Sequence, residues 1–158
     1  MVASLDGSPG SDAAAQAVAD RVRHGLFEND RASRMLGIRV EAVGPGSATL
    51  SFTVREDMLN GHAICHGGLI ATLADSAFAF ACNSYDELTV ASGFGIDFIA
   101  PGRLGDVLTA RCSEVSKAGR TGVYDTEVQN QRGERIAVFR GRSHTFKGRP
   151  AVPAAGPR

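Results

Sequence analysis

One acidic residue stands alone in an apolar stretch, and it is the residue best placed to do chemistry. Residues 69–81 are mostly Leu, Ile, Ala and Phe, and Asp75 is the acid among them. Their spacing covers nearly every side of a helix, which is typical of a helix inside a core. A buried carboxylate is costly unless it is paired, neutralised or used in function. Asp75 is therefore predicted to be catalytic, with pairing to a buried arginine as the alternative.

The residues just before this stretch suit the stabilisation of negative charge. His66, Gly67 and Gly68 open the predicted helix. Backbone N–H groups at a helix start lack intrahelical partners, and the helix dipole there favours anions. An acid two turns beyond such a start is the layout of an active site. Gly67 could also be required only for the turn.

Two other patterns of chemistry near the helix start are disfavoured. Cys65 and His66 are adjacent, but neighbours in a helix do not face each other, and no separate orienting triad is evident. His62 could join them as metal ligands, yet a clear fourth ligand is missing. We therefore expect neither a Cys–His nucleophile nor a metal site.

The composition narrows the class of protein. The chain has 158 residues, which suits one domain, and its 17 basic and 17 acidic residues cancel. That balance argues against a nucleic-acid partner. The sequence has no apolar run near the ~20 residues that cross a bilayer, and its start lacks the features of a signal peptide. We expect a cytoplasmic protein with no membrane partner.

The surrounding sequence predicts a sheet wrapped around the apolar helix. Residues 16–36 form a helix that Asp30 interrupts or recaps and Gly37 ends. Strands are predicted at 38–43, 47–54, 89–100, 106–117, 121–130 and 135–146, with a bulge near 113–115. Residues 47–54 alternate between polar and apolar, which predicts a half-buried strand, and Gly93 and Gly95 share one face where another backbone or a helix would approach closely. Short turns make the sheet antiparallel, and it must cover the helix, so the fold class is α+β. Residues 1–15 and 148–158 are predicted to be flexible, which leaves 16–147 as the domain.

The stretch from Leu59 to Ser84, LNGHAICHGGLIATLADSAFAFACNS, resembles the hotdog-fold thioesterases of the phenylacetate-degradation type, usually called PaaI. The similarity continues through IDF at 96–98, PG at 101–102, TGVYD at 121–125 and FRG at 139–141, and it covers about residues 31–146. It implies a hotdog fold, and hydrolysis of acyl-coenzyme A with aryl-acetyl groups as the acyl class. It also implies a dimer joined edge to edge and paired into a tetramer, with active sites between subunits. No cofactor is expected, because coenzyme A is part of the substrate.

The same resemblance implies roles for individual residues. The Gly67 N–H would polarise the thioester carbonyl, and Asp75 would attack the carbonyl or activate water. Asn60 would orient water or the Asp75 carboxylate of the partner subunit. His66 would contact the thioester or cap the loop, and Ser76 would hold the water.

Further polar residues are candidates for substrate contacts. Thr72, Asp75 or Ser76, and Asn83 share a stripe at helical spacing, which lines a site or faces a subunit. Gly68 and basic residues near the site mouth would bind coenzyme A and its phosphates. The basic candidates are Arg103, Lys117, Arg120, Arg140 and Arg142.

Two other functions remain open from the sequence. A hotdog acyl-CoA hydratase or dehydratase would need a catalytic histidine over the α and β carbons of the substrate, with a carboxylate partner. His66 and Asp75 fit this pair only loosely, and their placement matches the thioesterase motif better. A non-catalytic acyl-CoA-binding regulator of transcription would need a DNA-binding module. The first ~35 residues are too short and too neutral for a convincing helix-turn-helix dimer.

Overall fold

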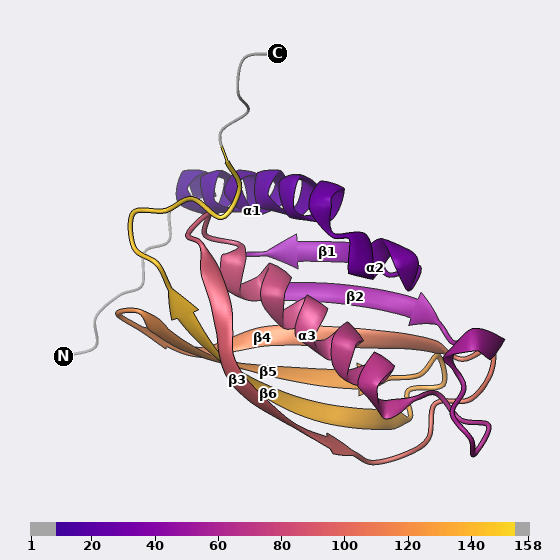
Figure 1. Cartoon of the computed structure of the whole chain (residues 1–158). Helices are drawn as coiled ribbons and strands as arrows, with labels where there is room; N and C mark the ends of the chain where they lie inside the picture. Colours follow the sequence, from indigo (N-terminus) through magenta and orange to yellow (C-terminus); the bar gives the residue numbers. More distant parts are fainter. Residues whose placement is uncertain (1–8, 154–158) are drawn as a thin grey trace.

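A single long helix, α3 (Gly67–Asn83), lies along the inner face of a six-stranded antiparallel sheet. Figure 1 shows the sheet curving around this helix, in a computed structural model that describes residues 9–153. The strand order is β1-β2-β4-β5-β6-β3. The strands are β1 (Arg39–Gly44), β2 (Ser47–Thr53), β3 (Thr89–Phe98), β4 (Val107–Ala118), β5 (Thr121–Gln129) and β6 (Arg135–Thr145). The predicted α+β layout is confirmed.

The alternating strands turn their apolar side chains toward α3. In β2, Ala48, Leu50 and Phe52 are buried, as the alternation predicts. The helix contributes apolar side chains on almost every side. Its Phe78 ring packs against Tyr124 of β5, with ring centroids 5.4 Å apart. The predicted bulge is present in β4, where the pairing with β5 shifts between Glu114 and Ser116.

Strand β3 is an edge of the sheet, since it pairs with β6 on one side only. Its Val90, Phe94 and Phe98 side chains are 43%, 45% and 52% exposed. The sequence placed Gly93 and Gly95 where another backbone or helix would approach closely. Within the described chain, no atom lies within 4 Å of a Cβ built on Gly95. That approach therefore stays a prediction, because the open side of an edge strand has no neighbour within one copy of the chain.

The N-terminal helices differ from the prediction in where they begin. Helix α1 (Pro9–Asn29) starts at Pro9 rather than at residue 16, so residues 9–15 are helical and were wrongly assigned to a flexible segment. Pro suits the first helical position, and Asp12 in the first turn complements the helix dipole. Residues 1–8 of that segment lie outside the described residues. Asp30 caps α2 (Arg31–Met35), and Gly37 has a φ of 70°, both as predicted.

The chain after β6 does not leave the domain immediately. Asp86 accepts hydrogen bonds from the backbone N–H groups of Ala151 and Val152, at 3.1 and 3.3 Å. The Leu88 N–H donates to the Arg149 carbonyl at 2.8 Å. The prediction of a flexible tail is therefore wrong for residues 149–152. Their backbone groups lie outside the sheet but form hydrogen bonds with the loop that follows α3. Residues 154–158 lie outside the described residues.

Candidate active site

A cavity of about 470 Å³ lies beside the start of α3. It is called the helix-start cavity here, and its lining residues are Asn60, Ile64, Cys65, Gly67, Ile70, Phe98, Ile99, Ala100 and Pro101. Two predicted site residues, Asn60 and Gly67, therefore share one cavity although they come from a loop and a helix. Most of the lining is apolar, which suits an apolar group presented to a few polar atoms.

The backbone of Gly67 offers an unused hydrogen-bond donor to this cavity. The next N–H groups are taken, because Gly68 donates to His66 Nδ1 at 3.0 Å and Leu69 donates to the His66 carbonyl at 2.9 Å. Within residues 9–153, no acceptor takes the Gly67 N–H. Gly67 is thus fit to donate to an oxyanion at a helix start, whereas the Gly68 N–H is not.

His66 is the N-cap of α3. Its Nδ1 accepts the Gly68 N–H, and its own backbone N–H donates to the Met58 carbonyl at 2.9 Å. An accepting Nδ1 carries no proton, so the neutral ring carries its proton on Nε2. The capping role left open by the sequence is confirmed. In this arrangement Nε2 is a donor and not a base.

Asn60 organises the loop that precedes the helix. Its Oδ1 accepts the N–H of His62 at 2.9 Å and of Ile64 at 3.4 Å. The loop closes further where the Asn60 N–H donates to the Ile64 carbonyl at 2.8 Å. No hydrogen bond from Asn60 Nδ2 is found in the described part of the chain. Asn60 therefore holds the loop with one end of its amide and leaves the other end available.

Asp75 lies just over two turns beyond Gly67, which is about 12 Å along the helix at about 1.5 Å per residue. It is partly buried, and burial raises the pKa of its carboxyl above the ordinary value. Among residues 9–153, it has no ion pair and no hydrogen bond from a side chain. No arginine of the same chain therefore pairs with Asp75, and the alternative of a buried arginine partner stays a prediction only for a partner subunit. Asp75 also does not line the helix-start cavity of its own chain.

Ser76 contacts α2. Its Oγ lies 3.4 Å from Oγ of Ser33, and the Ser33 hydroxyl donates to Asp30 Oδ2 at 2.5 Å. Thr72 uses its hydroxyl to donate to the Gly68 carbonyl at 2.8 Å. Within one chain, Thr72 and Ser76 of the predicted polar stripe therefore make local contacts and share no hydrogen bond with Asp75. A role of the stripe at a surface between subunits stays a prediction.

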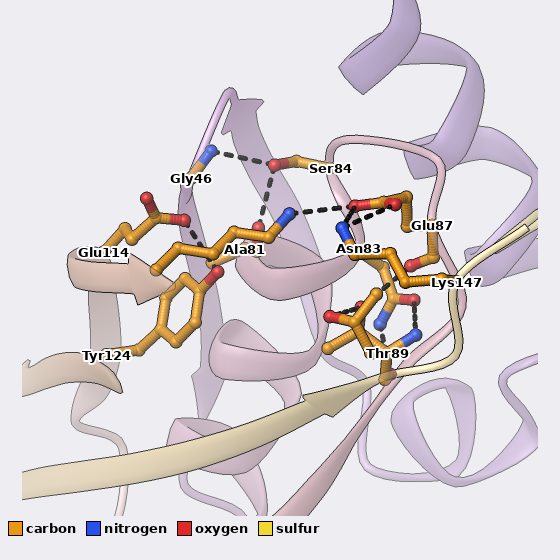
Figure 2. Close-up of polar contacts among 11 residues, drawn as sticks. Gly46, Ala81, Asn83, Ser84, Glu87, Thr89, Glu114, Tyr124 and Lys147 are labelled. Carbon is orange, nitrogen blue, oxygen red and sulfur yellow. Dashed lines mark hydrogen bonds and ion pairs between the residues drawn. The ribbon is translucent and has the colours of Figure 1, made fainter. Parts of the chain in front are cut away.

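The far end of α3 is fixed by polar contacts, which Figure 2 shows. Asn83 Nδ2 donates to the Thr89 carbonyl at 2.8 Å, and the Thr89 N–H donates back to Asn83 Oδ1 at 2.9 Å. Ser84 Oγ accepts the Gly46 N–H and donates to the Ala81 carbonyl, both at 2.8 Å. These residues join the helix end to β3 and to the β1–β2 turn. The sequence indicated Asn83 only as part of a stripe and did not predict this role.

Comparison with known proteins shows the family. Residues 62–137 match the thioesterase superfamily. The chain is 46% identical over 125 residues to the acyl-coenzyme A thioesterase PaaI of Escherichia coli K12, covering 79% of this chain and 89% of that protein. This chain belongs to the thioesterase superfamily. The predicted resemblance to the PaaI type and the prediction of a thioester hydrolase are confirmed.

Solved structures agree with this assignment. The E. coli PaaI protein from the phenylacetic acid degradation operon matches with a TM-score of 0.83 and 44% identity, covering 85% of this chain and 97% of that one. A hypothetical thioesterase of Streptococcus pneumoniae TIGR4 with coenzyme A matches with a TM-score of 0.68 and 25% identity, covering 71% and 88%. The hotdog thioesterase fold is thereby confirmed.

None of the basic residues predicted to bind coenzyme A lines the helix-start cavity. Lys117 lies near the other end of the molecule, 3.1 Å from Glu87 and over the Tyr85 ring. Arg140 makes two 2.6 Å hydrogen bonds to Asp125 and lines a separate hollow of about 690 Å³ on the outer sheet face. The charges of Lys117 and Arg140 are therefore already paired with carboxylates of the same chain.

The other three basic candidates are exposed and have no ion pair within residues 9–153. Arg103 follows Pro101 of the cavity lining by two positions, so it lies nearest the cavity along the chain. Arg120 belongs to the β4–β5 turn, and Arg142 lies beside Gly93 of β3. Binding of coenzyme A by these residues stays a prediction.

The cavity also contains Cys65, whose thiol is buried. Burial raises the pKa of this thiol to about 11, so it is protonated near neutral pH and is a poor nucleophile. In the described part of the chain, no group of three or more His, Cys, Asp or Glu residues is arranged to hold a metal ion. Over the same residues, no helix is long and apolar enough to span a membrane.

Proposed function

We propose that this thioesterase hydrolyses aryl-acetyl-CoA substrates of the phenylacetyl-CoA or hydroxyphenylacetyl-CoA type, releasing the free acid and coenzyme A. The observation that carries the proposal is the unused Gly67 N–H at a helix start, opening into an apolar cavity. The E. coli relative is an acyl-coenzyme A thioesterase, and the E. coli PaaI protein of known structure comes from the phenylacetic acid degradation operon. The similar hypothetical thioesterase of Streptococcus pneumoniae was solved with coenzyme A.

The helix start supplies the stabilisation of the developing oxyanion. The Gly67 N–H donates to the thioester carbonyl oxygen, and the α3 dipole adds partial positive charge there. The apolar lining strengthens this interaction because it excludes water. Asn60 also lines the cavity, and its Nδ2 is a further donor for the substrate. His66 does not line the cavity and caps the Gly68 N–H, so a direct contact between His66 and the thioester stays a prediction.

Asp75 acts on a substrate held by another copy of the chain. Its carboxylate cannot reach a carbonyl at Gly67 of the same chain, because about 12 Å of helix separates the two residues. The open edge of β3 provides the surface for a dimer joined edge to edge, which would bring Asp75 to the partner's cavity. Two such dimers then form the tetramer.

Two routes for Asp75 fit this arrangement. As a nucleophile, a carboxylate oxygen attacks the carbonyl carbon, the carbon–sulfur bond breaks, and water then hydrolyses the mixed anhydride. As a general base, Asp75 takes a proton from water while the water oxygen attacks the carbonyl. Coenzyme A leaves as a thiolate and takes up a proton in both routes. A raised pKa suits the base role, since it makes the carboxylate a better proton acceptor.

A panel of acyl-CoA substrates tests the proposal, with thiol release followed by a disulfide reagent. The panel comprises phenylacetyl-, hydroxyphenylacetyl-, benzoyl- and straight-chain acyl-CoA. We expect the two aryl-acetyl substrates to have the highest kcat/KM. Preference for straight chains would contradict the substrate class. Absence of thiol release from every substrate would contradict hydrolysis itself, and would favour a hydratase or a binding protein.

A further inference from the structure

The helix-start cavity has one aromatic wall, Phe98, the last residue of β3. Its ring points at the start of α3. A Cβ built on Gly67 would lie 3.0 Å from Phe98 Cζ and 3.4 Å from both Cε atoms. The tip of the ring therefore occupies the space directly beside the residue whose N–H would hold the substrate carbonyl.

The backbone around Phe98 is held by the sheet. Phe98 pairs with Ala137 of β6, and the next N–H, that of Ile99, donates to the Ile136 carbonyl at 2.8 Å. The ring itself is 52% exposed, so its position depends on this backbone and on the contact with Gly67 more than on burial. A wall fixed in this way can discriminate between shapes of ligand.

We propose that Phe98 determines the acyl specificity of the enzyme, by admitting aryl-acetyl groups and rejecting aroyl groups such as benzoyl. This inference rests on the proposed function. The apolar lining around Phe98 suits the acyl group better than the polar coenzyme A, so we place the acyl carbon bonded to the carbonyl next to the Phe98 ring when the carbonyl oxygen accepts the Gly67 N–H. A benzoyl ring is joined directly to the carbonyl carbon and stays in its plane by conjugation. It therefore meets the Phe98 ring.

A phenylacetyl group avoids this collision. Its tetrahedral CH₂ lets the aryl ring turn out of the carbonyl plane, toward the cavity walls formed by Ile64 and Ile70. The ring can then meet Phe98 in the offset or edge-to-face arrangement that aromatic pairs favour. Straight-chain acyl groups also bend at this carbon, so Phe98 excludes the rigid planar acyl groups in particular.

The test compares kcat/KM for phenylacetyl-CoA and benzoyl-CoA in the wild type and in Phe98→Ala. We expect the wild type to prefer phenylacetyl-CoA. In Phe98→Ala the preference should fall by about tenfold or more, chiefly because kcat/KM for benzoyl-CoA rises. Phe98→Leu keeps an apolar side chain without a planar ring and should lie between the two. It also replaces Phe98→Ala as the deciding variant if the latter does not fold.

Phe94→Ala is the matched control, since Phe94 is a similarly exposed phenylalanine on β3 that is absent from the cavity lining. Its substrate ratio should equal that of the wild type. The inference is overturned if the wild type uses both substrates equally, or if folded Phe98 variants keep the wild-type ratio. A wild type that hydrolyses no acyl-CoA overturns the proposed function as well, whereas a hydrolase with an unchanged ratio overturns only the role of Phe98.

Discussion

Replacing Asp75 by Asn separates a catalytic role from a structural one. Asn keeps the size of the side chain but can neither attack a carbonyl nor take a proton from water. Positioned acid–base groups contribute roughly 10²–10⁴ in rate, so we expect kcat to fall by about that factor or more. Coenzyme A binding should remain, because Asp75 is not among the residues proposed to contact coenzyme A.

The same substitution should leave the melting temperature level or raise it. Within residues 9–153, Asp75 has no cation partner, so its replacement leaves no buried cation unpaired. Burial raises its folded pKa above the unfolded value, so ionisation near neutral pH disfavours the folded state, and this penalty disappears as the pH falls through the raised pKa. A broken buried pair would instead cost roughly 3–5 kcal/mol, which is roughly 6–20 °C for a chain of this size.

Thiol release from phenylacetyl-CoA and thermal melting, measured on one preparation, decide the matter. Asp20→Asn is the matched control, because Asp20 is an exposed helical carboxylate of α1 that lies neither on β3 nor in the lining of the helix-start cavity. It should keep wild-type activity. An Asp75→Asn protein that melts normally and turns over at nearly the wild-type rate would refute the assignment. A steep fall in melting temperature would show that Asp75 has a structural partner.

Three further outcomes are expected. Cys65→Ser should keep substantial activity, because burial holds the thiol protonated; a loss of about three decades or more with an intact fold would restore a cysteine nucleophile. The kcat/KM of the wild type should fall on the acid side with a midpoint above the ordinary Asp value of about 3.9, since Asp75 must be ionised in either role and its pKa is raised. A flat profile from about pH 4 to 8 would argue against Asp75 as the titrating group. Light scattering should show a dimer or tetramer, because β3 leaves an apolar edge open; a stable and active monomer would contradict this.

The sequence was most informative where the structure depends on neighbours along the chain. The alternation of β2, the cap at Asp30 and the left-handed Gly37 were all predicted, because each depends on side-chain periodicity or on local backbone chemistry. The start of α1 was not, although Pro9 and Asp12 are good residues for a helix start. The Gly, Ser and Asp content of this segment is typical of a flexible terminus, whereas the alanines at 13–15 are good helix formers.

The site was predictable to the level of residue types, but its geometry was not. The sequence indicated Asn60, Gly67 and Asp75 from their chemistry and family pattern. Only the structure shows that Asn60 and Gly67 share a cavity while Asp75 lies outside it. Likewise, nothing local to Lys117 shows that Glu87 neutralises it at a distance from that cavity.

The sequence by itself therefore determined a buried helix with an acid, a donor-rich helix start and an alternating sheet around them. Those features follow from 3.6- and two-residue periodicities and from unpaired N–H groups at a helix end, which are properties of short segments. The tertiary structure decided which side chains meet. It set Phe98 against Gly67, joined Asn83 to Thr89, and held the C-terminal residues on Asp86. These contacts join residues distant along the chain, or depend on how a loop closes, so they exist only once the helix, the sheet and the loops are packed together.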